Sequence, residues 1–178
     1  ALADAEVEYQ DHKSDTIYAC FPVKTSNIQE LEGSNIVIWT TTPWTIPGNR
    51  ALAYNNEIDY VAININQVSE NSIAQENQII IVSEILLEDI CSQCGITKYD
   101  VKAKLKGYEL KGSIAKHPMA DAGYDYPVPL LDADYVTTEQ GTGFVHIAPG
   151  HGPEDYQLAH LKYGIEVPHT VNEDGTLM

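Results

Sequence analysis

The stretch GTGFVHIAPGHGPEDY, residues 141 to 156, combines glycines, two histidines and two acidic residues around one strand-to-helix transition. The middle of the stretch alternates as a short strand does, which places His146 on the same face as Phe144. The glycines before it allow a sharp turn or a close backbone approach. Pro153 suits the first turn of a helix, and the apolar spacing predicts that this helix ends at Gly164.

Glu154 and Asp155 fall in the first turn of that predicted helix, close in sequence to His146. Acidic residues in a first turn commonly do no more than complement the helix dipole. Alternatively, a carboxylate at the mouth of a glycine-lined pocket binds a cation such as an ammonium group. The spacing alone favours neither interpretation.

A second unusual stretch, TTTPWTIPGNRALAYN, covers residues 40 to 55. It follows residues 35 to 40, whose β-branched and aromatic side chains predict a strand buried on both faces. Threonines favour strands for ordinary packing reasons, but three of them followed by Pro-Trp-Thr indicate a rigid, hydroxyl-lined edge. We expect Pro43 and Pro47 to hold the chain in an extended, non-helical path.

Composition limits the classes of function. The 178 residues, 43% of them hydrophobic, are enough for one well-buried domain, after an acidic surface lead-in at residues 1 to 15. No apolar run is long enough to span a membrane and the start lacks a signal region, so we expect a cytoplasmic protein, by default a monomer. The net charge of −16 argues against an autonomous nucleic-acid-binding domain.

Six of the ten basic residues lie within nineteen positions. They favour a solvated strand face or a protected sheet edge, with an RNA-facing edge as the alternative. These residues are Lys98, Lys102, Lys104, Lys106, Lys111 and Lys116.

A helix is predicted between Ser83, as its N-cap, and Gly95. Cys91 and Cys94 lie three apart on it without a second cysteine pair, which favours a buried apolar face over a zinc site. We therefore expect no metal. Residues 120 to 129 are predicted to form a loop, and other segments alternate or are apolar in the manner of strands: 16–21, 51–54, 59–65, 78–82, 101–105, 108–114, 132–138 and 165–170.

Taken together, WTTTPWTIPGN at 39 to 49 and GTGFVHIAPGHGPEDY at 141 to 156 resemble the editing domain of bacterial isoleucyl-tRNA synthetases, which are class I enzymes. The resemblance extends over nearly the whole chain. It implies a β-rich mixed α/β fold, with a closed β-barrel core and peripheral helices. It also implies one editing domain, residues 1 to 178, cut from a longer synthetase.

The family activity implied is post-transfer editing, the hydrolysis of valine wrongly esterified to isoleucine tRNA, with isoleucyl-tRNA spared. The partners would be the 3' end of that tRNA and the remainder of the synthetase. HIGH-like and KMSKS-like sequences do not occur in the chain. ATP and magnesium therefore belong to the absent synthetic domain, and we expect no cofactor for this one.

The resemblance also implies a site. Asp155 resembles the carboxylate that binds the substrate α-ammonium, and His146 the residue that limits the side-chain pocket. Four further residues resemble groups that orient the ester, the water and the terminal adenosine: Thr40, Thr41, Thr42 and Asn49. These six are the expected catalytic residues, and a second set is expected to bind substrate: Trp44, Thr45, Gly141, Thr142, Gly143 and His151.

Two rival functions stay open. A metal-dependent hydrolase would use the histidines and acids between residues 146 and 160, although their spacing matches no zinc pattern. A binding module would capture aminoacylated RNA ends without hydrolysing them.

Overall fold

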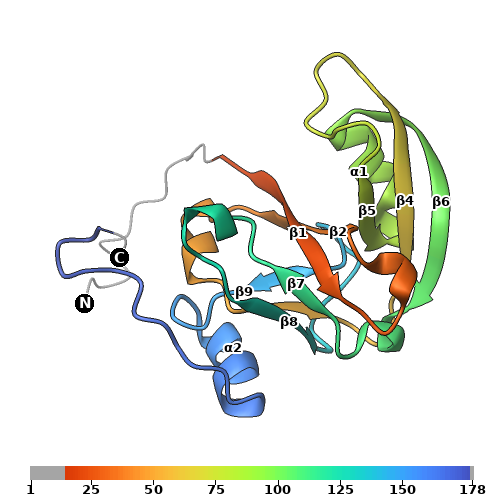
Figure 1. Ribbon diagram of the computed structural model, residues 1–178. Coiled ribbons are helices and arrows are strands. Elements are labelled where there is room, and N and C mark those ends of the chain that lie inside the picture. Colours follow the sequence, from red (N-terminus) through yellow and green to blue (C-terminus); the bar gives the residue numbers. More distant parts are fainter. Residues whose placement is uncertain (1–14, 177–178) are drawn as a thin grey trace, which may run out of the picture.

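The computed structural model describes residues 15 to 176, which form a mixed β-sheet with short helices around it (Figure 1). The surface lead-in expected at residues 1 to 15 lies almost entirely outside the described residues. The sheet has the order β6-β4-β5-β2-β1-β7-β8-β3-β9. Its strands are β1 (Ile17–Thr25), β2 (Asn35–Thr40), β3 (Ala51–Tyr54), β4 (Asp59–Val68), β5 (Ile79–Ser83), β6 (Ile96–Lys106), β7 (Ile114–Lys116), β8 (Pro127–Asp132) and β9 (Val145–Ile147).

Two strands change partners along their length and so link the parts of the sheet. Residues 17 to 22 of β1 pair with β2, and Val23 and Thr25 pair with β7, with an irregularity between these two residues. The first half of β8 pairs with β7, and its second half runs parallel to β3. In Figure 1, β1, β7, β8 and β9 lie in the centre, beside a second group formed by β4, β5, β6 and α1 (Leu87–Cys94).

The sheet is strand-rich and mixed, which confirms the β-rich α/β class. Its order begins at β6 and ends at β9, and no ladder joins these two strands within residues 15 to 176. The closed barrel that the resemblance implied is therefore not confirmed.

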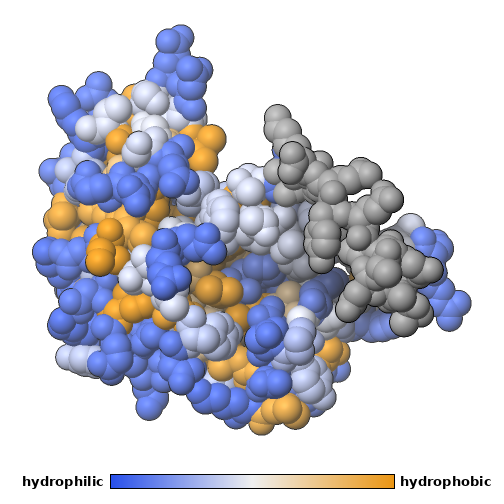
Figure 2. Space-filling model, turned by 180° about the vertical axis from the view of Figure 1, so that it is seen from behind, coloured by the Kyte–Doolittle hydropathy of each residue, from blue (hydrophilic) through white to orange (hydrophobic). Residues whose placement is uncertain are grey.

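Three apolar clusters fill the space around the sheet. The largest lies between the strands and includes Phe21, Ile38, Tyr60 and Phe144. A second packs α1 against β4 and β5, and a third packs the helix after β9 against β3. Seen from behind in Figure 2, hydrophobic residues show on the β4–β6 half among hydrophilic ones.

Helix α1 follows the pattern predicted from the sequence, with a later start. Residues Glu84–Leu86 form a 3-10 turn (η4) before it, and Gly95 ends the helix at φ 73°. Ser83 precedes η4 as its N-cap residue, as predicted, but it is wholly buried and its side chain makes no capping hydrogen bond. Cys91 and Cys94 are buried in the apolar cluster beneath the helix, as predicted.

The helix predicted from Pro153 is confirmed as α2 (Pro153–Tyr156), which continues as a π-helical turn, η7 (Gln157–Lys162). Gly164 follows at φ 68°. The edge strand expected at residues 165 to 170 does not form. The backbone groups of Ile165 are already engaged by the preceding helix, so they are not available for strand pairing. Its N–H donates to Ala159 O, and its carbonyl accepts a bond from the His160 side chain.

The extended path expected after the threonines is wrong. Pro43–Gly48 form a 3-10 helix, η3, closed by hydrogen bonds from Thr45 N to Thr42 O (3.0 Å) and from Asn49 N to Ile46 O (2.9 Å). Proline fits the first helical position because its φ is already helical and its N–H is not needed there.

Two further predictions fail in the second half of the chain. The strand expected at 132 to 138 ends at Asp132, because β8 begins earlier, at Pro127, inside the expected loop. A strand tolerates proline as its first residue. Residues 107 to 110 form a 3-10 turn, η5 (Gly107–Leu110), so only Ile114 of the alternating segment 108 to 114 lies in a strand. A smaller 3-10 turn, η6 (Ala120–Ala122), precedes β8, and another, η2 (Gln29–Leu31), follows β1.

Four of the six clustered lysines lie on the edge strand β6, as expected for a protected sheet edge, whereas Lys111 follows η5 and Lys116 lies in β7. Lys104 pairs with Glu84, and Lys106 pairs with Asp59 at 2.6 Å. None of the helices described between residues 15 and 176 is both long and apolar enough to cross a bilayer.

We predict that Gly143→Ala destabilises the fold more than Gly141→Ala. Both glycines have φ near +82°, so both substitutions introduce similar backbone strain of about 1 to 2 kcal/mol. Only at 143 would the added Cβ lie 2.5 Å from Ser83 Cβ, whereas at 141 its nearest neighbour is 4.0 Å away on Trp39. Chemical denaturation measures the loss of unfolding free energy in each variant. Equal losses would contradict the close packing of Gly143 against Ser83.

Candidate functional site

The two motifs meet where η3 contacts β9. Thr45 Oγ1 lies 2.9 Å from His146 Nε2, and Asn49 Nδ2 lies 3.4 Å from His146 Nδ1. One turn of η3 separates Thr45 from Asn49, so both side chains reach the same imidazole. His146 faces inward because β9 alternates, with Val145 exposed and His146 and Phe144 buried. The face predicted for His146 is confirmed.

The hydrogen-bond network assigns the tautomer of His146. Thr45 Oγ1 donates its proton to Thr42 O at 2.8 Å, so it accepts from His146 Nε2–H. The Asn49 amide is oriented by its bond from Nδ2 to Ala51 O at 2.8 Å, so the same nitrogen donates to His146 Nδ1. Both imidazole nitrogens are therefore engaged in the neutral ring.

Burial also favours the neutral ring. It lowers the pKa of His146 from 6.5 to about 4, with smaller contributions from the nearby imidazoles of His117 and His151. Asn49 Oδ1 is buried and has no hydrogen-bond partner among the described residues. The site therefore contains one polar acceptor that the described fold leaves unused.

A row of hydroxyls leads from the end of β2 to this imidazole. Thr40 Oγ1 lies 3.3 Å from Thr42 Oγ1 and accepts the N–H of Thr42 at 3.1 Å, and Thr42 Oγ1 lies 3.5 Å from Thr45 Oγ1. Thr40 and Thr45 are buried, Thr42 is half-buried, and Thr41 is exposed. Trp44 has 60% of its surface exposed. The structure thus brings Thr40, Thr42 and Thr45 together and directs Thr41 and Trp44 to solvent.

Asp155 lies beside the C-terminal end of β9. Its Oδ2 accepts the N–H of Ala148 at 2.8 Å, whereas its Oδ1 makes no hydrogen bond with residues 15 to 176. Burial raises the pKa of the Asp155 carboxyl, while the Ala148 N–H and the nearby His151 oppose this change. A half-buried carboxylate with one unused oxygen is suited to receive a cation.

His151 connects the two motifs a second time. A Cβ on Gly48 would lie 2.7 Å from the His151 ring, so the ring packs directly on the backbone of η3. The His151 side chain is otherwise exposed, and its Nε2 lies 3.1 Å from Thr170 Oγ1. A side chain at position 48 would therefore displace this ring, and no pattern in the sequence predicts the contact.

The Gly-Thr-Gly turn binds the sheet rather than the imidazole. Thr142 O accepts the N–H of Ser83 at 2.8 Å, and Gly143 O accepts the Tyr60 hydroxyl at 2.8 Å. Among residues 15 to 176, the Thr142 hydroxyl bonds only the backbone of Phe144. Gly141 and Gly143 line a pocket of about 220 Å³ with Trp39, Tyr135 and their neighbours. Of the predicted substrate-binding residues, the two glycines thus reach a cavity and the Thr142 side chain does not.

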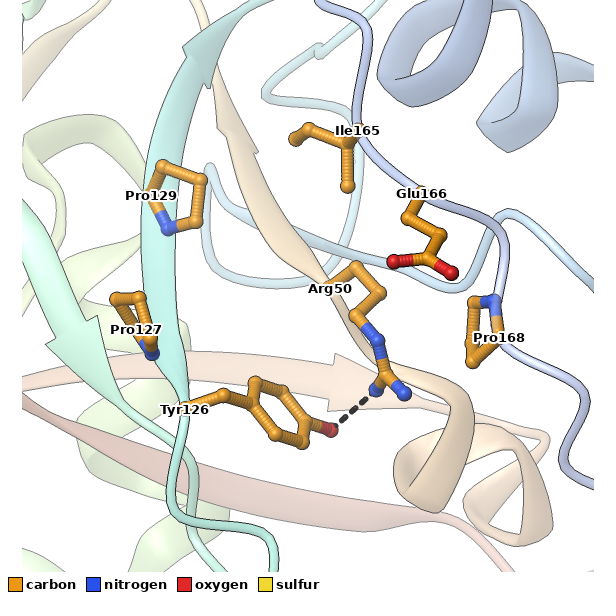
Figure 3. Close-up of a pocket in the computed structure, with 7 residues that line it drawn as sticks. All are labelled: Arg50, Tyr126, Pro127, Pro129, Ile165, Glu166 and Pro168. Carbon is orange, nitrogen blue, oxygen red and sulfur yellow. Dashed lines mark hydrogen bonds between the residues drawn. The ribbon is translucent and has the colours of Figure 1, made fainter.

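A larger pocket, of about 490 Å³, opens beside the residue that follows Asn49 (Figure 3). In Figure 3, Arg50 and Tyr126 face each other and are hydrogen-bonded, with Glu166 and Pro168 on the opposite wall. No sequence pattern predicted a role for Arg50, Tyr126 or the buried His117. The one available signal was that Arg50 is the only arginine in the chain.

The histidines proposed as metal ligands have separate partners. His146 binds Thr45 and Asn49, whereas His151 lies against Thr170 and His160 Nδ1 against Ile165 O. Within residues 15 to 176, no three His, Cys, Asp or Glu side chains are grouped closely enough to hold a metal ion.

Sequence comparisons agree with this pairing of motifs. Residues 13 to 177 match the family described as "Leucyl-tRNA synthetase, editing domain". The chain is 55% identical over 175 residues to an isoleucine--tRNA ligase from Pelagibacter ubique and 45% identical over 177 residues to one from Gluconobacter oxydans. Each match covers 98% of this chain, which spans about a fifth of the length of these relatives.

Structural comparisons support the fold. The crystal structure of GlLeuRS-CP1 has a TM-score of 0.63 at 18% identity, covering 91% of this chain and 74% of that one. The editing domain of the P. knowlesi cytosolic leucyl-tRNA synthetase has a TM-score of 0.59 at 16% identity, covering 83% and 62%. The chain therefore belongs to the family of tRNA synthetase editing domains, and its sequence relatives confirm the resemblance to the isoleucyl type.

Proposed function

We propose that this domain hydrolyses the ester of valine misacylated onto isoleucine tRNA and spares isoleucyl-tRNA. The supporting observation is the contact between Thr45 and His146, which joins the two motifs, together with the partly free carboxylate of Asp155 at Ala148, two residues after His146. The domain would act as part of a longer cytoplasmic synthetase, with the tRNA 3' end as its partner. The reaction as proposed needs no bound metal or other cofactor.

Asp155 is the proposed receptor for the substrate α-ammonium. Its Oδ1 is available, and an arriving cation would offset the burial that raises the pKa of this carboxyl. A charge-assisted hydrogen bond of this kind contributes about 1.5 to 3 kcal/mol.

His146 would limit the size of the side-chain pocket rather than act as a base. Both of its nitrogens are engaged, so the neutral ring has no unused lone pair for a proton from water. A neutral ring also avoids repelling the ammonium nearby. One methylene is worth only about 1 to 3 kcal/mol in an apolar pocket, as isoleucyl-tRNA synthetases themselves illustrate, so a steric limit at a second site adds discrimination.

The threonine row would orient the ester and the attacking water. Water adds to the ester carbonyl carbon, the bond from that carbon to the ribose oxygen breaks, and the ribose oxygen takes up a proton. The half-buried Thr42 is the hydroxyl closest to solvent in the row, and the exposed Thr41 lies next to it in the chain. An ester is an activated substrate, so positioning and hydrogen-bond donors supply the required rate without a nucleophilic side chain.

Deacylation tests the proposal directly. Valyl- and isoleucyl-tRNA, both on isoleucine tRNA, are incubated with the full-length synthetase that contains this segment, with a chelator present and without ATP. Release of valine with isoleucine retained supports the proposal. Loss of valine release in the chelator would favour a metal-dependent hydrolase, and binding without release would favour a capture module.

We predict that Asp155→Asn lowers the rate of valine release by about 10- to 100-fold, because the charge-assisted bond to the ammonium is lost. Glu154→Gln is the matched control, since Glu154 is an exposed carboxylate in the same helical turn. The control should keep the parental rate. Equal rates for the two variants would remove Asp155 from the proposed site.

We predict that the His146 imidazole titrates with a midpoint near pH 4, measured by NMR of its ring carbons. Because the folded pKa lies below the ordinary value of 6.5, the unfolded chain binds this proton first as the pH falls. His146 therefore costs stability progressively from about pH 6.5 downward, reaching about 3 kcal/mol near pH 4. The raised pKa of Asp155 contributes with the opposite sign. A His146 midpoint above pH 6 would contradict the neutral ring.

A further inference from the structure

Three side chains outside the proposed site bind the carbonyls of the segment that contains Thr45 and Asn49. His117 Nε2 lies 2.9 Å from Ile46 O. The Tyr126 hydroxyl donates to Asn49 O at 2.8 Å, and Arg50 Nη1 donates to the same oxygen at 2.7 Å. We refer to His117, Tyr126 and Arg50 as the carbonyl clamp.

The clamp residues also hold one another. Arg50 Nη1 donates to the Tyr126 hydroxyl at 2.5 Å, and the guanidinium lies 4.2 Å from the centre of the Tyr126 ring (Figure 3). The His117 ring lies between Tyr124 and Tyr126, with ring centres 5.2 Å and 5.3 Å away.

The orientation of His117 is set from the other side of its ring. Met119 N–H donates to His117 Nδ1 at 3.1 Å, so the proton of the neutral ring is on Nε2 and is donated to Ile46 O. The side chain is 1% exposed, and burial lowers its pKa. A buried, neutral donor of this kind holds its acceptor without competition from water.

Asn49 transmits this restraint to the proposed site. Its carbonyl is held by Tyr126 and Arg50, while its side-chain amide donates to His146 Nδ1. Any rotation of the Asn49 backbone that breaks the first pair of bonds also displaces the amide. A displacement of about 1 Å is enough to weaken a bond that is already 3.4 Å long.

We infer that the carbonyl clamp positions Asn49, and through it His146, so that the imidazole is held as the Nε2–H tautomer within the editing site. The inference rests on the proposed function for its catalytic consequence, but not for its effect on His146. His117, Tyr126 and Arg50 are positioning residues, because they act on the site only through Asn49 and the η3 backbone.

The test is Tyr126→Phe, which removes the hydroxyl and keeps the ring. Tyr124→Phe is the matched control: Tyr124 stacks on the same His117 ring, and its hydroxyl makes no hydrogen bond with residues 15 to 176. The 15N shifts of the His146 ring nitrogens, measured at pH 7 on the chain described here, report the tautomer. Parental protein and Tyr124→Phe should show Nε2–H, and Tyr126→Phe a mixture of both tautomers.

The second readout is deacylation by the full-length synthetase. Tyr126→Phe and Arg50→Lys should each lower kcat about 10-fold with little change in KM, because neither residue contacts the substrate. Thermal unfolding checks that both variants fold, and a purely structural role would change the melting temperature without changing the tautomer.

The inference fails if Tyr126→Phe leaves the His146 shifts identical to those of Tyr124→Phe, or if parental His146 is not the Nε2–H tautomer. A full-length enzyme that releases no valine would overturn the proposed function alone. The tautomer comparison would then still decide the role of the clamp.

Discussion

The hydrogen bond between Thr45 and His146 is the contact on which the rest of the site depends. It joins residues 101 positions apart, lies in a buried environment, and brings the threonine motif against the histidine motif. Two local structures make it geometrically feasible. The 3-10 turn of η3 directs Thr45 and Asn49 to one side, and the alternation of β9 turns His146 inward to meet them.

The electrostatics of the site follow from burial rather than from the net charge. The chain has a formal charge of −16, yet the imidazole at the junction is neutral and its partners are hydroxyl and amide groups. Asp155 brings a formal charge to this end of β9, with Glu154 beside it in the chain, and burial weakens the preference of Asp155 for the ionised form.

Local patterns predicted much of the fold. β2, β3, β9 and α1 follow from β-branched runs, alternation and glycine stops, each decided by neighbours in sequence. The predictions that were wrong concern segments whose structure is decided by contacts with distant residues or with the preceding helix. Pro43 and Pro47 fit an extended path and a 3-10 turn equally well, and the turn forms where its side chains meet β9. Ile165 has a strand former's side chain, but its backbone groups bind the helix before it.

The two motifs that meet at η3 and β9 were recognisable in the sequence, but the bonds between them were not predictable. Family motifs pointed to His146, Asn49 and Asp155, whereas the engagement of both His146 nitrogens depends on distances that no spacing encodes. His117, Tyr126 and Arg50 could not be recognised in advance, because their role arises only when residues from 117 to 126 fold behind η3.

The most direct measurement is a crystal structure of the domain with a non-hydrolysable valyl-adenosine analogue. We predict that the analogue binds between η3 and the start of α2, with its ammonium on Asp155 Oδ1 and its valine side chain against the His146 ring. An analogue bound instead in the pocket beside Arg50 and Tyr126, with Asp155 and His146 unoccupied, would contradict it.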